Sequence, residues 1–218
     1  MTQEELQQIA AQLRNPSGKG GIKVAERMNV NNGLMNSWAI EQLDVLPGDH
    51  ILEVGPGNGR FVPGIVGKHS SVSYAGYDHS KLMVSQAEQY NTTLVQAGQA
   101  RFVLRDGPTM PFADGAFTKA LAVNVIYFWE DPAAELAELH RVLAPSGRLL
   151  LVIRPKSVME RLPFVQHGFH LFESADVVSM LETNRLRAVD TIVQSGPAQQ
   201  VDSEMLPMLT ALIIGERV

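Results

Sequence analysis

Three glycines occupy alternate positions directly after a short apolar run, in the segment HILEVGPGNGRF at residues 50–61. Gly55, Gly57 and Gly59 allow positive φ angles and let a ligand approach the main chain, at a cost in conformational entropy. A tight turn alone would also use glycine here. The other interpretation is a loop between a strand and a helix that binds a ligand through its backbone, and the class of ligand depends on the residues around it.

The spacing of the glycines separates two classes of ligand. A dinucleotide-binding loop has the spacing G-x-G-x-x-G, and its third glycine lets the helix pack closely on the strand. Counted from Gly55, the spacing here is G-x-G-x-G, and Arg60 stands where that third glycine would be. The loop is one residue too tight for a pyrophosphate. It suits a ligand that has an amino-acid tail and no phosphate.

The elements that must position this loop alternate regularly from residue 50 onward. Strands that alternate with helices indicate a parallel sheet with helices on both faces, and buried parallel strands are near-continuous apolar runs. We expect strands at 50–55, 72–78, 100–106, 117–128 and 146–155, and helices at 59–68, 79–97 and 131–143.

The alternation changes after Arg154. We expect a helix at 174–183, a strand at 186–193, a turn in SGPAQQ (195–200) and a last strand at 208–218. Two strands joined by a loop rather than a helix predict an antiparallel edge. The expected fold class is therefore α/β, a Rossmann-like and mostly parallel seven-stranded sheet with helices on both faces and an antiparallel last strand.

The region before the first strand has helical periodicity. We expect a helix at 3–14, a break in NPSGKGG (15–21) and a second helical region at 22–46 that is interrupted near 29–33. This divides the chain into an N-terminal helical cap or lid at 1–46 and a ligand-binding domain at 47–218. The loosely patterned, aromatic segment 154–174 is expected to form a substrate lid.

The composition excludes several classes of function. The formal net charge is −5, and the lysines and arginines are scattered, which argues against nucleic acid as a partner. The chain has no cysteine, so disulfides, thiolate catalysis and cysteine-bound zinc are excluded. The polar N-terminus is unlike a secretory signal, and no apolar run reaches the roughly 20 residues of a membrane span. We expect a soluble, cytoplasmic protein with no membrane partner, as a monomer or homodimer.

Five segments in order carry a resemblance to a known family. They are LEVGPGNG, YAGYDHS, LRDGPTMPFADGAF, NVIYFWEDP and ELHRVLAPSGRLLLV, within residues 20–155. Together they resemble the motifs of the class I S-adenosylmethionine-dependent methyltransferases, in particular the enzymes that act on small molecules. The resemblance implies S-adenosylmethionine as cofactor, S-adenosylhomocysteine as product and transfer by direct displacement, in which the protein mainly aligns the two reactants.

The resemblance also implies which residues hold the cofactor. Asp78 would accept from both ribose hydroxyls, although a strand-end turn or a helix N-cap also uses Asp. Asp106 would accept from the adenine amine beside the Gly107 N–H, although an Asx-turn is the alternative. The glycine loop would meet the methionine moiety, and Glu53 would orient the loop or the ammonium. The full cofactor set is Glu53, Gly55, Gly57, Gly59, Asp78, His79, Asp106, Gly107 and Asn124.

Four residues are expected to contact the methyl acceptor, and each has an alternative role. Trp129 is expected either in the pocket wall or in the core. Arg154 would pair with an anionic substrate or cap the sheet edge. Asn29 and Asn32 belong to a segment, MNVNNGLMNSW, that would contact ligand as a lid, although its Met and Trp spacing also fits ordinary core.

Three residues are the candidates for a general base, which a protonated nucleophile would require. They are His167, His170 and Tyr127, and ordinary loop histidines are the alternative for the first two. The H-x-x-H spacing does not indicate a metal site, because no carboxylate partner is evident nearby. Residues 124–127 have the outline of an N-P-P-Y motif that holds an amine or amide nitrogen, but both prolines are missing.

The sequence departs from the family motifs at two places, and two alternative functions stay open. Thr118 stands after Phe117 where the family often has an Asp of structural role, and the late Gly-Phe turn is absent from LETNRLRAV. A non-catalytic S-adenosylmethionine-binding protein is one alternative. A nicotinamide-dependent oxidoreductase is the other, and the glycine spacing disfavours it.

Overall fold

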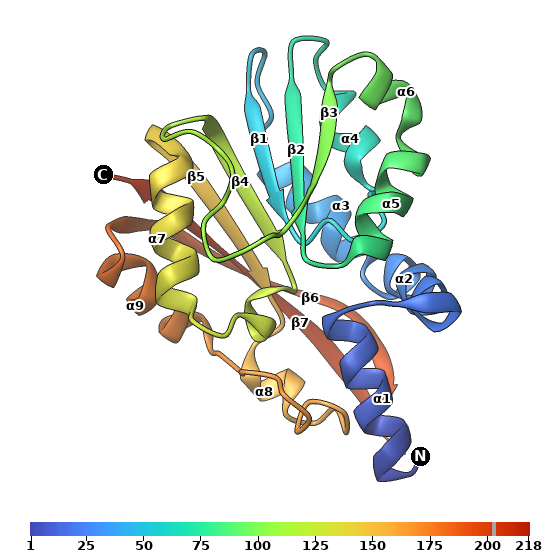
Figure 1. The fold of residues 1–218 in the computed structure, drawn as a ribbon. Coiled ribbons are helices and arrows are strands. Elements are labelled where there is room, and N and C mark those ends of the chain that lie inside the picture. Colours follow the sequence, from blue (N-terminus) through green and yellow to red (C-terminus); the bar gives the residue numbers. More distant parts are fainter. Residues whose placement is uncertain (202–203) are drawn as a thin grey trace.

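A seven-stranded sheet forms the centre of the molecule (Figure 1). In this computed structural model, which describes residues 1–201 and 204–218, the strand order is β3-β2-β1-β4-β5-β7-β6. The first five strands are parallel, and β7 is antiparallel to both β5 and β6. The predicted fold class, with its antiparallel last strand, is confirmed. The strands are β1 (His50–Val54), β2 (Ser73–Asp78), β3 (Ala100–Leu104), β4 (Phe117–Val123), β5 (Leu143–Ile153), β6 (Leu186–Val201) and β7 (Glu204–Arg217).

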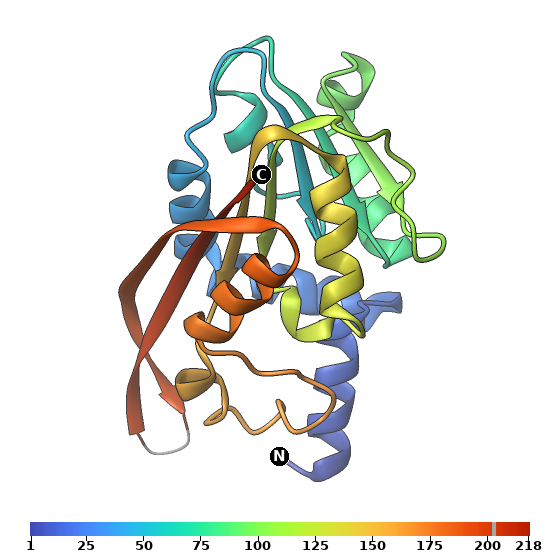
Figure 2. The same cartoon turned by 90° about the vertical axis from the view of Figure 1, so that its left-hand side faces the viewer.

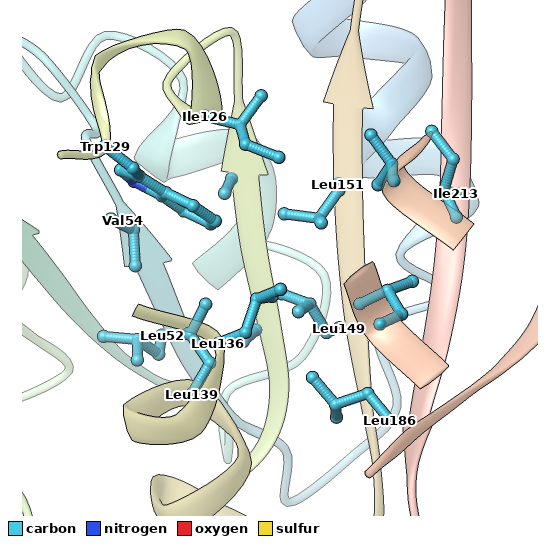
Figure 3. Close-up of a cluster of buried hydrophobic side chains, with 14 of the residues drawn as sticks. Leu52, Val54, Ile126, Trp129, Leu136, Leu139, Leu149, Leu151, Leu186 and Ile213 are labelled. Carbon is cyan, nitrogen blue, oxygen red and sulfur yellow. The ribbon is translucent and has the colours of Figure 1, made fainter. Parts of the chain in front are cut away.

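Helices cover both faces of the sheet (Figures 1 and 2). On one face lie α7 (Pro132–Val142) and α9 (Ser174–Thr183), and Figure 3 shows Leu136 and Leu139 of α7 beside Leu52 of β1. The other face is covered by α3 (Gly33–Gln42), α4 (Val62–Val66) and α5 (Lys81–Tyr90), with the short α6 (Thr92–Gln96) following α5. Because both faces are buried, the central strands are mostly apolar, as the sequence predicts, with Glu53 in β1 and Lys119 in β4 as buried charged residues.

The N-terminal cap consists of α1 (Gln3–Arg14), α2 (Gly18–Asn31) and α3. The predicted first helix is confirmed, and Thr2 and Glu5 form a capping box at its start. The predicted break at 15–21 is confirmed only for residues 15–17, because α2 begins at Gly18. A Cβ on Gly21 would lie 2.7 Å from the carbonyl carbon of Pro16, so this glycine permits the close turn between the two helices rather than ending one. The expected interruption at 29–33 shrinks to Asn32, and the last helix ends at Gln42 rather than at residue 46.

The fourth strand ends earlier than its apolar sequence predicts. We expected a strand over 117–128, but β4 stops at Val123 and residues Ile126–Phe128 form a 3₁₀ turn. Asn124 causes the change, because its φ of 57° is left-handed and ends the ladder. Asn adopts this conformation more readily than other non-glycine residues. The aromatic residues that follow therefore leave the sheet at its carboxyl edge.

The predicted turn at 195–200 is also wrong, because β6 runs on to Val201. The register of the β6–β7 hairpin shifts between Gly196 and Gln199, so Gly196 and Pro197 form an irregularity within the strand. Proline is tolerated at such a bulge because it lacks the N–H of a ladder bond. Pairing reaches Val201 and Glu204, and β7 is longer than the predicted 208–218.

The segment after β5 contains little regular structure. It includes the four-residue α8 (Lys156–Met159) and a series of turns that reach α9, whose bounds match the predicted helix at 174–183. None of the helices in the described part of the chain has the length and apolar character that crossing a membrane requires.

Candidate active site

The glycine loop lies at the carboxyl end of β1, in the middle of the sheet. Gly55, Gly57 and Gly59 have φ angles of 70°, 57° and 69°. A Cβ on Gly55 would collide with Cγ1 of Val125, and one on Gly59 would lie 2.6 Å from Nδ2 of Asn91. A Cβ on Gly57 would meet no atom within 4 Å. The outer two glycines are therefore required by protein packing, whereas Gly57 presents its backbone to the cavity.

Asp78, the last residue of β2, fixes this loop from the side. Its Oδ2 accepts a 3.2 Å hydrogen bond from the Gly57 N–H, and its Oδ1 accepts from the Ser80 N–H at 2.8 Å. Burial raises the pKa of Asp78, and the bonds from Ser80 and Gly57 oppose that shift. The N-cap of α5 is Ser80, whose hydroxyl accepts from Met83. Asp78 thus takes the strand-end turn rather than the N-cap of the two alternatives.

Glu53 of β1 is buried beneath the loop. The hydroxyl of Tyr74 donates a 2.5 Å hydrogen bond to its Oε2. Burial raises the pKa of Glu53 to about 7, the bond from Tyr74 lowers it, and the charge of Asp78 raises it further. The carboxyl group of Glu53 therefore changes its charge near neutral pH.

A cavity of about 850 Å³ opens beside this loop. Its walls come from the cap helices, the glycine loop, the carboxyl ends of β2, β4 and β5, and the segment after α8. The structure thus gathers most of the predicted site at one edge of the sheet. The predicted residues that line the cavity are Glu53, Gly55, Gly57, Asp78, His79, Asn124, Tyr127, Trp129, Arg154, Asn29 and Asn32.

Other predicted residues lie outside this lining. Asp106 and Gly107 are exposed in the loop after β3. His167 and His170 lie in the turns before α9, and the N–H of His170 donates to the carbonyl of Tyr127. Gly59 instead packs against Ala87 and Asn91 of α5 and its C-cap. Within the described chain, the cavity therefore contains neither histidine proposed as a base.

Tyr127 connects the ends of β4 and β5. Its hydroxyl donates to the carbonyl of Arg154 at 3.0 Å and accepts from the Arg154 N–H at 2.5 Å. Burial raises the pKa of Tyr127 well above its usual value of 10, and its bond to Arg154 opposes that shift. The guanidinium of Arg154 donates in turn to Oδ1 of Asn32 at 3.3 Å. Tyr127 is therefore a positioning residue for Arg154, with no ionisable proton near neutral pH.

Trp129 fulfils both of its predicted alternatives. It is buried in the core beside Val54 (Figure 3), and it also lines the cavity. Asn124 lies on the same edge, where its Nδ2 is 3.0 Å from Sδ of Met35 in α3. Of the segment's Met and Trp residues that were expected in the core, Met35 is buried against the sheet and Trp38 packs partly buried against the same cluster.

The cap is bonded directly to the strand ends that carry the site. Nε2 of His79 lies 2.6 Å from the carbonyl of Arg14, and the Ser80 hydroxyl donates to the carbonyl of Pro16 at 2.6 Å. Asn29 of α2 donates to Oδ1 of Asn58 in the glycine loop at 3.2 Å. These contacts place α1 and α2 beyond the carboxyl ends of β1 and β2 (Figure 1).

An ion pair joins the cap to the segment after β4. Arg14 and Glu130 approach to 2.7 Å, and both side chains are substantially exposed. Both residues line the cavity, so side chains from two distant parts of the sequence meet in its lining.

Three residues of the cavity region were not predicted from the sequence. Tyr74 holds Glu53, and Tyr77 lines the cavity with a buried hydroxyl that has no hydrogen-bond partner among the described residues. Arg105 lines the cavity and forms an ion pair with Glu135 of α7. Tyr74 and Tyr77 could have been predicted from the sequence, because a tyrosine hydroxyl within a buried strand requires a hydrogen-bond partner.

Comparison with known proteins supports the family resemblance that the sequence motifs indicate. Residues 52–151 match the family described as Methyltransferase domain. The chain is 32% identical to the "O-methyltransferase resE" of Aspergillus sclerotiorum, over 63% of this chain and 49% of the relative. It is 25% identical to the "Ubiquinone/menaquinone biosynthesis C-methyltransferase UbiE" of a Marinomonas species, over 84% of this chain and 77% of the relative.

A solved structure shares the fold over nearly the whole chain. It is the complex between the Haloferax volcanii Trm112 methyltransferase activator and the putative methyltransferase, with a TM-score of 0.74, 17% identity and 99% of each chain covered. The chain spans about half the length of resE, so the activity of that whole relative is not carried over. The fold and these matches support the class I S-adenosylmethionine-dependent methyltransferase family that the motifs resemble, and the model described as Methyltransferase domain matches residues 52–151 of the chain.

Proposed function

We propose that the protein transfers a methyl group from S-adenosylmethionine to a small-molecule acceptor bound in the same cavity. The observation that carries the proposal is the cavity of about 850 Å³ that joins the open side of Gly57 to the ends of β4 and β5. This volume lies in the usual range of small-molecule sites. The names of the two relatives describe O- and C-methyltransferases, one of them in quinone biosynthesis, and support a small acceptor.

Two features of the chain fit the cofactor. Gly57 has a left-handed φ and leaves open space where a Cβ would stand, which suits close approach of a ligand to its backbone. The Tyr77 hydroxyl is a buried polar group with no partner among the described residues, and a nucleoside offers partners for such groups. S-adenosylmethionine supplies a methyl group on a positively charged sulfur that leaves as a neutral thioether.

The roles of individual residues follow from their positions along this edge. Asp78 would receive the ribose hydroxyls, and Glu53 would act on the ammonium directly or through the loop. The backbones of Gly55 and Gly57 would meet the methionine moiety. Asn124, at the end of β4, stands between this region and the acceptor region. Asp106 and Gly107, exposed outside the lining, remain predicted contacts for adenine.

In this proposal the chain contributes alignment and exclusion of water. Tyr127 cannot act as a base near neutral pH, because burial raises its pKa and its hydroxyl is bonded to the Arg154 backbone and to Oδ1 of Asn124. His167 and His170 lie outside the cavity lining. A direct displacement without a protein base suits a nucleophile that is already deprotonated or carries a free electron pair.

Two segments would act as lids over the reactants. Residues 1–46 provide the first, through the contacts of Arg14, Pro16 and Asn29 with the strand ends. Residues 154–174 provide the second, since Met159, Leu162 and Phe169 line the cavity. The domain division at residue 46 follows from this role.

A thermal-shift experiment tests the cofactor part of the proposal. Wild type, Asp78→Asn and the control Asp190→Asn, an exposed position of β6 outside the cavity lining, are each melted with S-adenosylmethionine, S-adenosylhomocysteine, NAD and NADP. A ligand at about 100 times its Kd stabilises by about 2.7 kcal/mol, which raises Tm by a few degrees. We expect a shift with the first two ligands that Asp78→Asn reduces. A shift only with a dinucleotide would overturn the proposal in favour of hydride transfer.

Turnover separates the enzyme from a non-catalytic binding protein. Release of S-adenosylhomocysteine is measured with a panel of phenols, quinols and amines. Acceptor-dependent release in wild type that Asp78→Asn lowers supports transfer. Tight binding of S-adenosylmethionine without release of S-adenosylhomocysteine in the presence of any compound of the panel counts against methyl transfer.

A further inference from the structure

Arg154 is a buried cation at the acceptor end of the cavity. It follows β5 directly, it is 8% exposed, and it lines the cavity. The Tyr127 hydroxyl holds its backbone N–H and carbonyl, so the origin of the side chain is fixed. A guanidinium has five N–H donors, and the one acceptor it finds among the described residues is Oδ1 of Asn32.

The carboxylates that line the cavity are all engaged elsewhere. Glu130 pairs with Arg14, and Glu135 pairs with Arg105. Glu53 bonds to Tyr74, and Asp78 bonds to the glycine loop and Ser80. Within the described chain, no carboxylate lies within ion-pair distance of Arg154.

A buried guanidinium without a counter-ion is costly, and proteins normally pair such charges. Burial lowers the pKa of Arg154, which is the direction expected for a cation that lacks a partner. Its fork of donors matches a carboxylate with two parallel hydrogen bonds. The missing partner of Arg154 is thus an anion that enters the cavity.

The strand order separates this anion from the glycine loop. β4 lies between β1 and β5, and neighbouring strands are about 4.8 Å apart, so Arg154 begins roughly 10 Å from Gly55 along the edge. The cavity lining also contains the apolar side chains of Phe128, Met159 and Phe164, and Met159 belongs to α8, which begins two residues after Arg154. A molecule that fills this end therefore needs an apolar body and one anionic group.

We propose that the methyl acceptor is an aromatic or apolar carboxylic acid whose carboxylate pairs with Arg154, about 10 Å from the loop that holds the cofactor. Asn32 of the cap holds the guanidinium in place through the bond to its Oδ1. The carboxylate is the anchor of the acceptor, and a different atom receives the methyl group. This inference rests on the proposed function.

Calorimetric titration with a matched pair of probes tests the charge recognition. Protein saturated with S-adenosylhomocysteine is titrated with 4-hydroxyphenylacetate and with the neutral 4-hydroxyphenylacetamide. Wild type is expected to bind the acid at least tenfold more tightly than the amide. In Arg154→Met this preference falls to within twofold, and Arg154→Lys retains part of it. Lys156→Met removes an exposed positive charge two residues away and keeps the full preference.

Each other outcome overturns the inference. An equal affinity for acid and amide, a preference that survives in Arg154→Met, or no binding of either probe to wild type would each do so. A tenfold loss of S-adenosylhomocysteine affinity in Arg154→Met, with adenosine affinity unchanged, would instead assign the anion to the amino-acid tail of the cofactor. Failure of wild type to bind S-adenosylhomocysteine at all would contradict the proposed function itself.

Discussion

The Tyr74 hydroxyl donates to a carboxyl oxygen of Glu53 at 2.5 Å, and both side chains are buried below the glycine loop. Because burial raises the pKa of Glu53 from its ordinary value of 4.5 to about 7, the native protein holds a proton that the unfolded chain has already lost. The cofactor region therefore contains a carboxyl group whose charge depends on pH in the physiological range.

The unfolding free energy should fall as pH rises because of this group. Stability depends on pH according to the difference in bound protons, and here the native state binds more. Between pH about 4.5 and about 7 we expect wild type to lose about 3 kcal/mol relative to Glu53→Gln. Urea denaturation of both proteins at pH 5, 6, 7 and 8 measures the difference. A difference that stays constant with pH would show that Glu53 ionises normally.

Gly57→Ala should mainly lower ligand affinity, whereas Gly55→Ala should mainly lower stability. Alanine at Gly57 meets no protein atom, so we expect only about 1 kcal/mol of backbone strain but a loss of S-adenosylhomocysteine affinity of tenfold or more. Alanine at Gly55 collides with Val125 and should mainly lower Tm. Adding Val125→Ala to Gly55→Ala should recover part of that Tm. If wild type and Gly57→Ala bind S-adenosylhomocysteine with equal affinity, the ligand does not contact the Gly57 backbone.

Tyr127→Phe should destabilise the protein without changing its shape. The change leaves the buried N–H of Arg154 without its acceptor, and an unsatisfied buried group costs about 1–3 kcal/mol. Chemical denaturation checks this value. Tyr90→Phe is the matched control, because Tyr90 is 55% exposed and its hydroxyl only accepts from Arg60. A Tyr127→Phe protein as stable as the control would contradict the role of Tyr127 at the strand ends.

Lys119 and Asp49 should be strongly coupled in a double-mutant cycle. Both are buried and approach to 2.9 Å at the amino edge of the sheet, where Thr118 also donates to Asp49. Burial alone would raise the pKa of Asp49, but the bonds from Leu46, Thr118 and Lys119 lower it overall. We expect Lys119→Met to cost about 3–5 kcal/mol, because it leaves a buried charge unpaired, and Asp49→Asn to recover part of this.

The more exposed pair of Arg187 and the half-buried Glu216 provides the comparison for that cycle. Arg187→Met should cost less than about 1 kcal/mol, since exposed ion pairs contribute little. Similar costs for Lys119→Met and Arg187→Met would show that the buried pair is not stabilised by its charge.

Much of the site could be predicted from the sequence because of one property of parallel sheets. The carboxyl ends of parallel strands lie along the same edge, so polar residues that end successive apolar runs meet in space. Asp78, Asn124 and Arg154 were found in this way, and all three line one cavity. Thr118 stands where the family often has a structural Asp, and its hydroxyl donates to the buried Asp49.

The parts that were missed depend on contacts between distant residues. The glycines after Pro16 signal a helix end by propensity, yet the packing of Gly21 against Pro16 places them inside α2. Gly196 and Pro197 signal a turn, yet the pairing of β6 with β7 continues past them. The bonds from Tyr127 to Arg154 join the ends of two strands and have no local pattern in the sequence.

The position of β7 constrains the order in which the sheet can be assembled. This strand lies between β5 and β6, although it follows both in sequence. On a ribosome, β1 to β5 emerge first and pair with one another, but the outer edge of β5 has no partner until residues 204–217 have left the exit tunnel. An unpaired edge of a buried, apolar strand invites pairing with other chains. A polypeptide interrupted before Glu204 would therefore present that edge and aggregate, even with the glycine loop and its surrounding strands complete.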